Sequence, residues 1–498
     1  MINATRLLIA ALALLLGACA PRIAETGSNA ASRFEAAKQS PPDLRAFLYR
    51  MPKGGDLHNH LSGAAYAETL IRAGAANGIC VDPATSAISP CGHATRKLAD
   101  ALRDANINRA LIDAWSMRSF VPSSGSSGHD HFFATFGKFG GAASMGEMAA
   151  DVVDRAGRQH MRYIELMITF QGGAVTSMAR SLQWTGNMAD FRSRLMAAGL
   201  PALVQKARPD IDAGEARMRA IMYCGTPDAT PGCSVTVRWL QQVSRTNPPG
   251  VVFAQALFGA LLNQADPRVV GLDFVAPEDD HVALADYALQ MRMLDYLHGV
   301  LPPFNVSLHA GELTLGLVAP ENLLFHVRQA VELGHARRIG HGVDVMYETD
   351  PHSLLREMAQ KRVAVEINLT SNDQILGVRG NAHPFPIYRT AGVPTVLSTD
   401  DEGVERIDRT HELQRAVSEF GLDWPTLVGL ERNTLEYAFV AGASLWADPV
   451  AWREVPACDG AAPASPPSDC AAFLRTSEKA TLQWQLEHDL DAFDRAPR

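Results

Sequence analysis

The sequence predicts an α/β fold, a (β/α)8 TIM barrel, and three observations favour this fold class. Eight short apolar runs with β-prone residues are spread along the chain, and segments with helical apolar spacing separate the later ones. Residues that can bind a metal or move protons end four of the runs. TIM barrels place their functional residues at the C-terminal ends of strands. A doubly wound sheet is the alternative, but no glycine-rich phosphate loop follows any of these runs.

The predicted elements follow in chain order. An N-terminal helix is expected in residues 34–52, and Gly55–Leu61 forms the first strand. The other seven predicted strands are Arg162–Ile168, Val235–Leu240, Val269–Phe274, Val306–His309, Arg338–His341, Val363–Asn368 and Val393–Leu397. Helical spacing predicts helices at His281–Gly299, Glu321–Gly334 and Pro351–Lys361. Residues 80–160 form a long insertion after the first strand, and a last helix near Lys479–Asp491 follows a loop rich in Pro, Ala and Ser.

The N-terminal residues predict export. Arg6 precedes the apolar run Leu7–Leu16, which has the length of a secretory signal. The residues Leu16-Gly17-Ala18-Cys19 resemble a bacterial lipobox, which implies a signal peptide at 1–18 and lipidation of Cys19. A plain signal peptide and an uncleaved anchor are the alternatives.

We expect residues 19–40 to form a flexible tether and residues 41–498 to form a single domain. Ala20 is not the acidic residue linked to inner-membrane retention, so the predicted location is the periplasmic face of the outer membrane. No tract after residue 20 is apolar for long enough to span a bilayer, so a lipid anchor would be the only membrane contact.

Six further cysteines form three close pairs in loop-like stretches, which suits an exported chain. The pairs are Cys80 with Cys91, Cys224 with Cys233, and Cys458 with Cys470. Six cysteines allow about 15 disulfide patterns, of which nearest-neighbour pairing is the simplest, and buried free thiols are the alternative.

Composition excludes one class of function. The net charge is −9 and 47% of the residues are hydrophobic, which provides a large core but no basic face for nucleic acid.

The residues that end the strands predict a metal centre. Side chains alternate along a strand, so His58 and His60 point to the same face. His309 and the Asp400-Asp401 pair end later strands and could complete a divalent-metal site.

Taken together, the motifs resemble the adenosine deaminase family, specifically its secreted branch related to adenosine deaminase growth factors. The resemblance covers roughly residues 45–445 and includes four blocks in order: Met51–Gly63, His309-Ala310-Gly311-Glu312, Gly340-His341-Gly342 and Ser398-Thr399-Asp400-Asp401.

The resemblance implies a hydrolase that deaminates adenosine or 2′-deoxyadenosine with one zinc ion per chain. The implied zinc ligands are His58, His60, His309 and Asp400. Glu312 would protonate the purine ring, which requires a raised pKa in a dry pocket. His341 would orient the attacking water, and Asp401 would hydrogen-bond the purine or the attacking oxygen.

Two departures from the family bear on the substrate. Ser62 stands where the family has an acidic residue that contacts ribose, and Ala276 stands where many relatives have glycine. A deaminase of adenine or another aminated heterocycle is therefore the second hypothesis. A lipoprotein that binds metal and ligand without catalysis is the third. The oligomeric state is open, since the N-terminal helix and residues 80–160 could form either a dimer contact or a lid.

Overall fold

Eight parallel strands form the centre of the molecule. The computed structural model describes residues 29–496. One sheet has the order β1 (Lys53–His60), β5 (Met161–Ile168), β6 (Thr236–Ser244) and β7 (Val269–Val275). A second sheet contains β8 (Ser307–Ala310), β9 (Arg338–His341), β10 (Ala364–Ile367) and β11 (Thr395–Leu397) in that spatial order. Single parallel bridges, Asn59 to Asp400 and Leu272 to Val306, join the sheets at both edges. All eight predicted strands are present, and the TIM-barrel prediction is confirmed.

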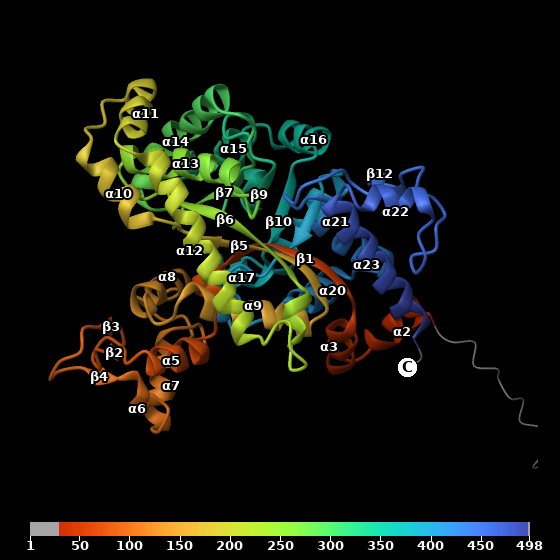
Figure 1. The fold of residues 1–498 in the computed structure, drawn as a ribbon, viewed down its shortest axis with the longest axis horizontal. Coiled ribbons are helices and arrows are strands. Elements are labelled where there is room, and N and C mark those ends of the chain that lie inside the picture. The colour runs from red at the N-terminus through yellow and green to blue at the C-terminus, as the bar shows by residue number, and fades with distance from the viewer. Residues whose placement is uncertain (1–28, 497–498) are drawn as a thin grey trace, which may run out of the picture.

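Helices cover the outside of the strands (Figure 1). They include α9 (Met145–Arg158), α10 (Gly172–Ser181), α11 (Met188–Ala197), α12 (Leu200–Ile221), α13 (Pro249–Ala265), α14 (His281–Val300), α15 (His326–Glu332), α16 (Pro351–Lys361), α17 (Leu369–Leu376), α18 (Phe385–Thr390), α19 (Glu402–Glu405), α20 (Arg409–Phe420) and α21 (Trp424–Glu436). Helix α13 is buried along most of its length because it is apolar on nearly every face. The helix predicted at Glu321–Gly334 is shorter than expected. A 3-10 turn, Pro320–Leu323, precedes α15, and Phe325 between them has non-helical backbone angles, with φ −155° and ψ −4°.

The N-terminal segment differs from its prediction. Two helices, α2 (Ala30–Ala37) and α3 (Pro41–Arg50), replace the single helix expected at 34–52. Residues 29–40 are therefore not a flexible tether. Phe34 is fully buried, with its ring 5.7 Å from Phe47 and 5.8 Å from Trp424. These tertiary contacts order a segment whose composition suggested a linker. The predicted signal peptide and Cys19 lie outside the described residues.

The insertion after β1 forms a separate lobe at the lower left of Figure 1. Helices α4 (Leu61–Ala64) and α5 (Ala67–Ala76) lead to a small sheet of β2 (Cys80–Val81), β3 (Ile88–Ser89) and β4 (Arg96–Lys97). Helices α6 (Leu98–Ala101), α7 (Ala105–Ala114) and α8 (Gly128–Phe139) follow. This lobe has its own hydrophobic cluster, which includes Leu111, Trp115 and Phe132. The insertion is thus a packed unit that holds α8 in place.

The chain ends on the other side of the strands. The hairpin of β12 (Trp446–Asp448) and β13 (Arg453–Glu454) precedes α22 (Ser468–Leu474) and α23 (Glu478–Arg495). Figure 1 shows α8 and α23 on opposite sides of the strands. No helix between residues 29 and 496 combines the length and hydropathy needed to cross a bilayer.

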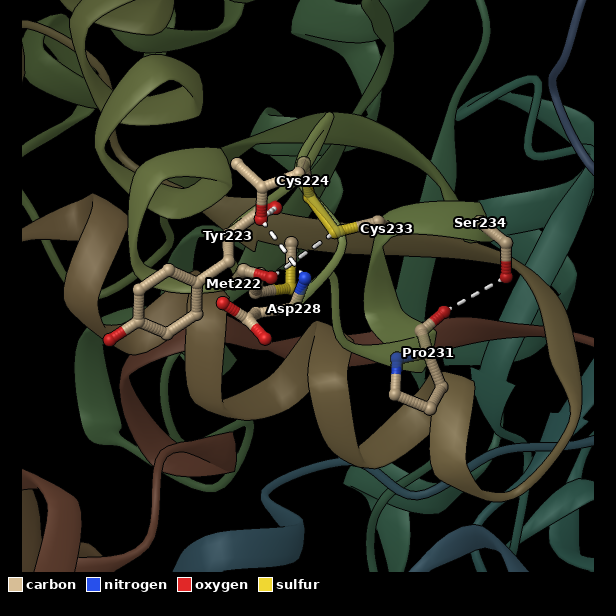
Figure 2. Close-up of a disulfide and its surroundings, with 8 residues drawn as sticks. Met222, Tyr223, Cys224, Asp228, Pro231, Cys233 and Ser234 are labelled. Atoms are coloured by element: carbon tan, nitrogen blue, oxygen red, sulfur yellow. Dashed lines mark hydrogen bonds between the residues drawn. A yellow bond between two sulfur atoms is a disulfide. The ribbon is translucent and has the colours of Figure 1, made fainter.

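All six cysteines predicted to pair do so with their nearest neighbours. Disulfides join Cys80 to Cys91, Cys224 to Cys233, and Cys458 to Cys470. Figure 2 shows the second of these in the loop between α12 and β6, where the Ser234 hydroxyl also donates to the Pro231 carbonyl at 2.9 Å. Each disulfide closes a loop of 9 to 12 residues, so each restrains only its own connection.

Candidate metal centre and active-site cavity

The four predicted metal ligands meet at the C-terminal ends of the strands. His58 and His60 lie in β1, His309 lies in β8, and Asp400 follows β11. The closest approaches are 3.1 Å between the Nε2 atoms of His60 and His309, and 3.3 Å from His60 Nε2 to Asp400 Oδ1. His58 Nε2 lies 3.5 Å from the same carboxylate oxygen. Ligand atoms of His58, His309, His341 and Asp400 also lie within 4.8 Å of one another.

Two buried carboxylates orient the histidine rings, and the sequence analysis gave neither a role. Glu366 Oε2 is 2.7 Å from His58 Nδ1, and Asp273 Oδ1 is 2.9 Å from His309 Nδ1. Asp273 Oδ1 also accepts the His309 backbone N–H at 3.1 Å. With Nδ1 donating, each ring directs its unprotonated Nε2 toward the other ligands. The signal that could have revealed both residues was an acid within a predicted apolar strand.

A divalent cation fits this set of residues. His58 Nε2 is buried and has no hydrogen-bond partner, although it faces Asp400. A buried imidazole nitrogen without a partner costs free energy, and a cation between it and Asp400 would satisfy both groups. Burial would lower the pKa of His58, but the Asp400 and Glu366 carboxylates outweigh burial and raise it well above its usual value. The pocket therefore favours positive charge beside Asp400, as a metal centre requires.

Asn372 fixes the tautomer of His341. The Phe385 backbone N–H can only donate, so His383 Nδ1, 3.1 Å away, must accept. Burial lowers the pKa of His383 to about 4, so the neutral ring carries its proton on Nε2 and donates it to Asn372 Oδ1 at 3.0 Å. The Asn372 amide group then donates to His341 Nδ1 at 2.9 Å.

His341 consequently carries its proton on Nε2, because burial lowers its pKa to about 3 and keeps the ring neutral. That Nε2 lies 3.6 Å from Asp400 Oδ2 and has no hydrogen-bond partner among the described residues. A protonated nitrogen cannot bind a metal, so His341 is a hydrogen-bond donor to the site and not a ligand. The tautomer of His60 is not fixed in this way. Its Nδ1 lies 2.9 Å from the Gln242 amide, and the other partner of that amide is the Thr169 hydroxyl, which can donate or accept.

Two glycines in the motifs are required by close approaches. A Cβ atom on Gly340 would lie 2.7 Å from the His58 ring, and one on Gly63 would lie 1.6 Å from Asp401 Oδ1. Larger residues at either position would displace the ring or the carboxylate. Three non-glycine residues of the site, Ala276, His341 and Asp400, have φ angles of 82°, 69° and 56°. Backbone strain of this kind concentrates at functional sites.

Glu312 follows β8 and is held over the metal centre by its backbone. Glu278 accepts the backbone N–H groups of Gly311 and Glu312 at 3.1 and 2.8 Å, and His326 Nδ1 lies 2.6 Å from Glu278 Oε1. Burial, followed by the negative charges of Asp400 and Glu278, raises the pKa of Glu312 well above its usual value. The raised pKa favours the protonated form of this side chain, which is the form that the resemblance implies for the acid.

The two adjacent aspartates differ in protonation. Burial would raise the pKa of Asp400, but His58, His341 and His60 outweigh it and lower that pKa below its usual value. Burial and the charge of Asp400 raise the pKa of Asp401 well above its usual value. Asp401 Oδ1 is buried without a hydrogen-bond partner within residues 29–496, so this carboxyl group is free to bind a ligand.

A cavity of about 310 Å³ opens onto these groups. All the predicted catalytic and substrate-binding residues line it: Ser62, Ala276, Glu312, His341 and Asp401. Three aromatic side chains on α8, together with Ile375 of α17, form an apolar part of the cavity wall: Phe132, Phe133 and Phe136. The sequence did not predict this wall, because the insertion is far from the strands along the chain. The wall excludes water and suits a flat aromatic ligand.

Comparison with known proteins identifies the family. The family model described as adenosine deaminase matches residues 144–444, which is more than half of the chain, and the chain belongs to that family. The matched region contains His309, Glu312, His341, Asp400 and Asp401 but begins after His58 and His60. The structure, however, places both of these residues in the same centre.

Similarity to individual relatives is partial. Adenosine deaminases of Salmonella heidelberg and Salmonella schwarzengrund are each 35% identical over 139 residues, which is 28% of this chain and 38% of the length of either relative. Two solved structures share the fold. The N6-methyl-AMP deaminase of Arabidopsis thaliana has a TM-score of 0.52 at 18% identity, covering 80% of this chain and 94% of its own. The adenine deaminase of Arthrobacter aurescens has a TM-score of 0.50 at 15% identity, covering 80% and 97%.

Proposed function

We propose that this protein is a zinc-dependent hydrolase that converts adenosine or 2′-deoxyadenosine to the corresponding inosine nucleoside and ammonia. The observation that carries the proposal is the placement of Glu312, whose pKa is raised, in one cavity with His60, His309 and Asp400 and with an aromatic wall. Membership of the adenosine deaminase family supports it.

The ligand set suits zinc, which binds histidine nitrogen and carboxylate oxygen. His58, His60, His309 and Asp400 would hold the ion, while Glu366 and Asp273 would keep two of the rings in the required tautomer. When bound, such an ion supplies a hydroxide-like nucleophile near neutral pH.

The residues of the chain perform the remaining steps. Glu312 donates its proton to the purine ring nitrogen beside the carbon that carries the amino group, which makes that carbon electrophilic. His341 donates its Nε2 hydrogen to the attacking oxygen and holds it in place. The raised pKa of Asp401 favours its protonated form, and this carboxyl group would hydrogen-bond the base or the attacking oxygen. The α8 aromatic wall keeps bulk water out during the reaction.

A second substrate class is favoured by one observation. Ser62 lines the cavity and offers a single hydroxyl group in place of an acid, so it can make fewer contacts to ribose. Deamination of free adenine or another aminated heterocycle is the function that this difference supports.

One assay separates these functions. The purified protein, with its metal content measured, is offered adenosine, 2′-deoxyadenosine and adenine separately, and deamination is followed by absorbance. Turnover of the nucleosides that disappears in Glu312→Gln supports the first proposal. Turnover of adenine alone moves the assignment to the second function. No turnover of any of the three by a metal-loaded protein contradicts the first function and the deamination of adenine.

We further propose that the protein is exported and anchored by a lipid on Cys19. Its proposed location is the periplasmic face of the outer membrane. The three disulfides support export, because such bonds persist in oxidising compartments. Labelling with a radioactive fatty acid, compared between the natural chain and Cys19→Ala, tests the anchor. Equal labelling of the two chains, or no labelling of either, would contradict it.

A further inference from the structure

A second cavity lies at the opposite end of the strands from the metal centre. It has a volume of about 540 Å³ and lies beside the residues that precede β9 and β10. The volume is in the range of cavities that bind small organic molecules. Its wall is rich in basic side chains: His335, Arg337, Lys361, Arg362 and Lys479.

Three of these cations have no carboxylate partner within residues 29–496. Arg337 donates to the Asn305 side-chain oxygen at 2.8 Å, and Arg362 donates to the Tyr437 hydroxyl. Lys479 Nζ donates to the Glu436 backbone carbonyl at 2.7 Å. All three bonds are to neutral oxygens, so the positive charges remain uncompensated.

The other charged groups of this wall are already engaged. Lys361 pairs with Glu357 at 2.7 Å, and His335 lies 2.9 Å from Asp295. The Glu436 carboxylate accepts only from neutral groups, Ser444 Oγ at 2.6 Å and Gln483 Nε2 at 3.0 Å, so its negative charge offsets one of the three cations. The cavity thus presents a surplus of positive charge that a ligand could neutralise.

The position of Lys479 in its helix also makes its positive charge unfavourable. It lies in the first turn of α23, where the helix dipole favours negative charge. Burial lowers the pKa of Lys479 to about 8; Glu436 and Glu165 oppose this shift, and Arg337 and Arg338 add to it. An anion in the cavity would offset the unfavourable helix dipole and stabilise the buried ammonium group.

We propose that this cavity binds the phosphate group of a small anion. Guanidinium groups match phosphate oxygens in geometry, and an ammonium group adds a point charge. A phosphate carries up to two negative charges, which matches the surplus of two positive charges left when Glu436 is set against the three cations. The phosphate can belong to a soluble ester or to a phospholipid headgroup.

Isothermal titration of the full-length chain with inorganic pyrophosphate at low ionic strength tests the proposal. We expect one binding site per chain, with affinity that falls as salt is added. Lys479→Gln or Arg337→Gln should each weaken binding at least about tenfold, because each removes a charge-assisted hydrogen bond. Arg475→Gln removes an exposed cation close in sequence that does not line the cavity, and it should leave binding unchanged.

A parallel experiment distinguishes the two sources. Flotation with vesicles of phosphatidylglycerol and phosphatidylcholine, compared with phosphatidylcholine alone, reports headgroup binding. Pyrophosphate binding that depends on Lys479 supports a soluble ester, and vesicle binding without pyrophosphate binding, again dependent on Lys479, supports the lipid. Binding of neither probe, or binding that both variants retain at full strength, would overturn the proposal. Melting temperatures of the variants confirm that they fold, and Arg362→Gln replaces any variant that does not.

Discussion

Replacing Asn372 by aspartate should reverse the tautomer of His341 with almost no change in shape. The amide group that donates to His341 Nδ1 at 2.9 Å becomes a carboxylate oxygen, which can only accept. His341 must then carry its proton on Nδ1, and the Nε2 hydrogen that faces the site is lost.

The expected loss of kcat follows from the removal of one hydrogen-bond donor. One preorganised donor to the reacting oxygen is worth about 2.7–4 kcal/mol, or about 10²–10³ in kcat. Metal content should stay at one ion per chain, because the metal ligands do not include His341.

Two measurements together decide this prediction. Steady-state kinetics give kcat, and 15N NMR of histidine-labelled protein shows which ring nitrogen of His341 is protonated. Asn368→Asp is the matched control, since it places the same new charge 3.5 Å from His341 Nδ1, beyond a good hydrogen bond. A protonated Nδ1 in the natural protein, or an unchanged kcat in a variant whose tautomer has reversed, would refute the reasoning.

Three further predictions concern the metal, the backbone and pH. Asp273→Asn should weaken metal affinity about 10–100-fold, measured by chelator competition, because His309 loses the carboxylate that orients it; unchanged affinity would contradict this role. Ala276→Gly should raise the melting temperature, because a φ of 82° costs a non-glycine residue on the order of 1 kcal/mol. A lower melting temperature would show instead that the methyl group packs favourably. The kcat should fall as pH rises through the raised pKa of Glu312, because the acid form is the active one. Metal content is measured at each pH and must stay constant. A kcat that rises over this range would assign Glu312 a different role.

Much of the barrel was predictable because its strands are local apolar runs. The four catalytic motifs were equally visible, since each ends a strand. The helix at Glu321–Gly334 was overestimated because apolar spacing continues across Phe325, whose backbone is not helical. The tether prediction failed for residues 29–40 because Phe34 finds partners in α3 and α21 that local sequence does not reveal.

Contacts across long separations account for the rest of the site. Glu366 and His58 are 308 residues apart, and Asp273 and His309 are 36 apart, so the acids that orient the rings appear only in three dimensions. The apolar wall of α8 belongs to an insertion whose packing depends on its own hydrophobic cluster. The fixed tautomer of His341 required three successive hydrogen bonds from Phe385, His383 and Asn372.

The most direct test of the proposed function compares the natural protein with Glu312→Gln. Both are purified, their metal content is determined, and the conversion of adenosine to inosine is followed by absorbance. Glutamine has nearly the shape of the acid but no ionisable proton, so the account predicts bound metal in both proteins and turnover only in the natural one. Equal turnover in the two would show that Glu312 is not the acid. A folded, metal-loaded natural protein that leaves adenosine unchanged would contradict the proposed function.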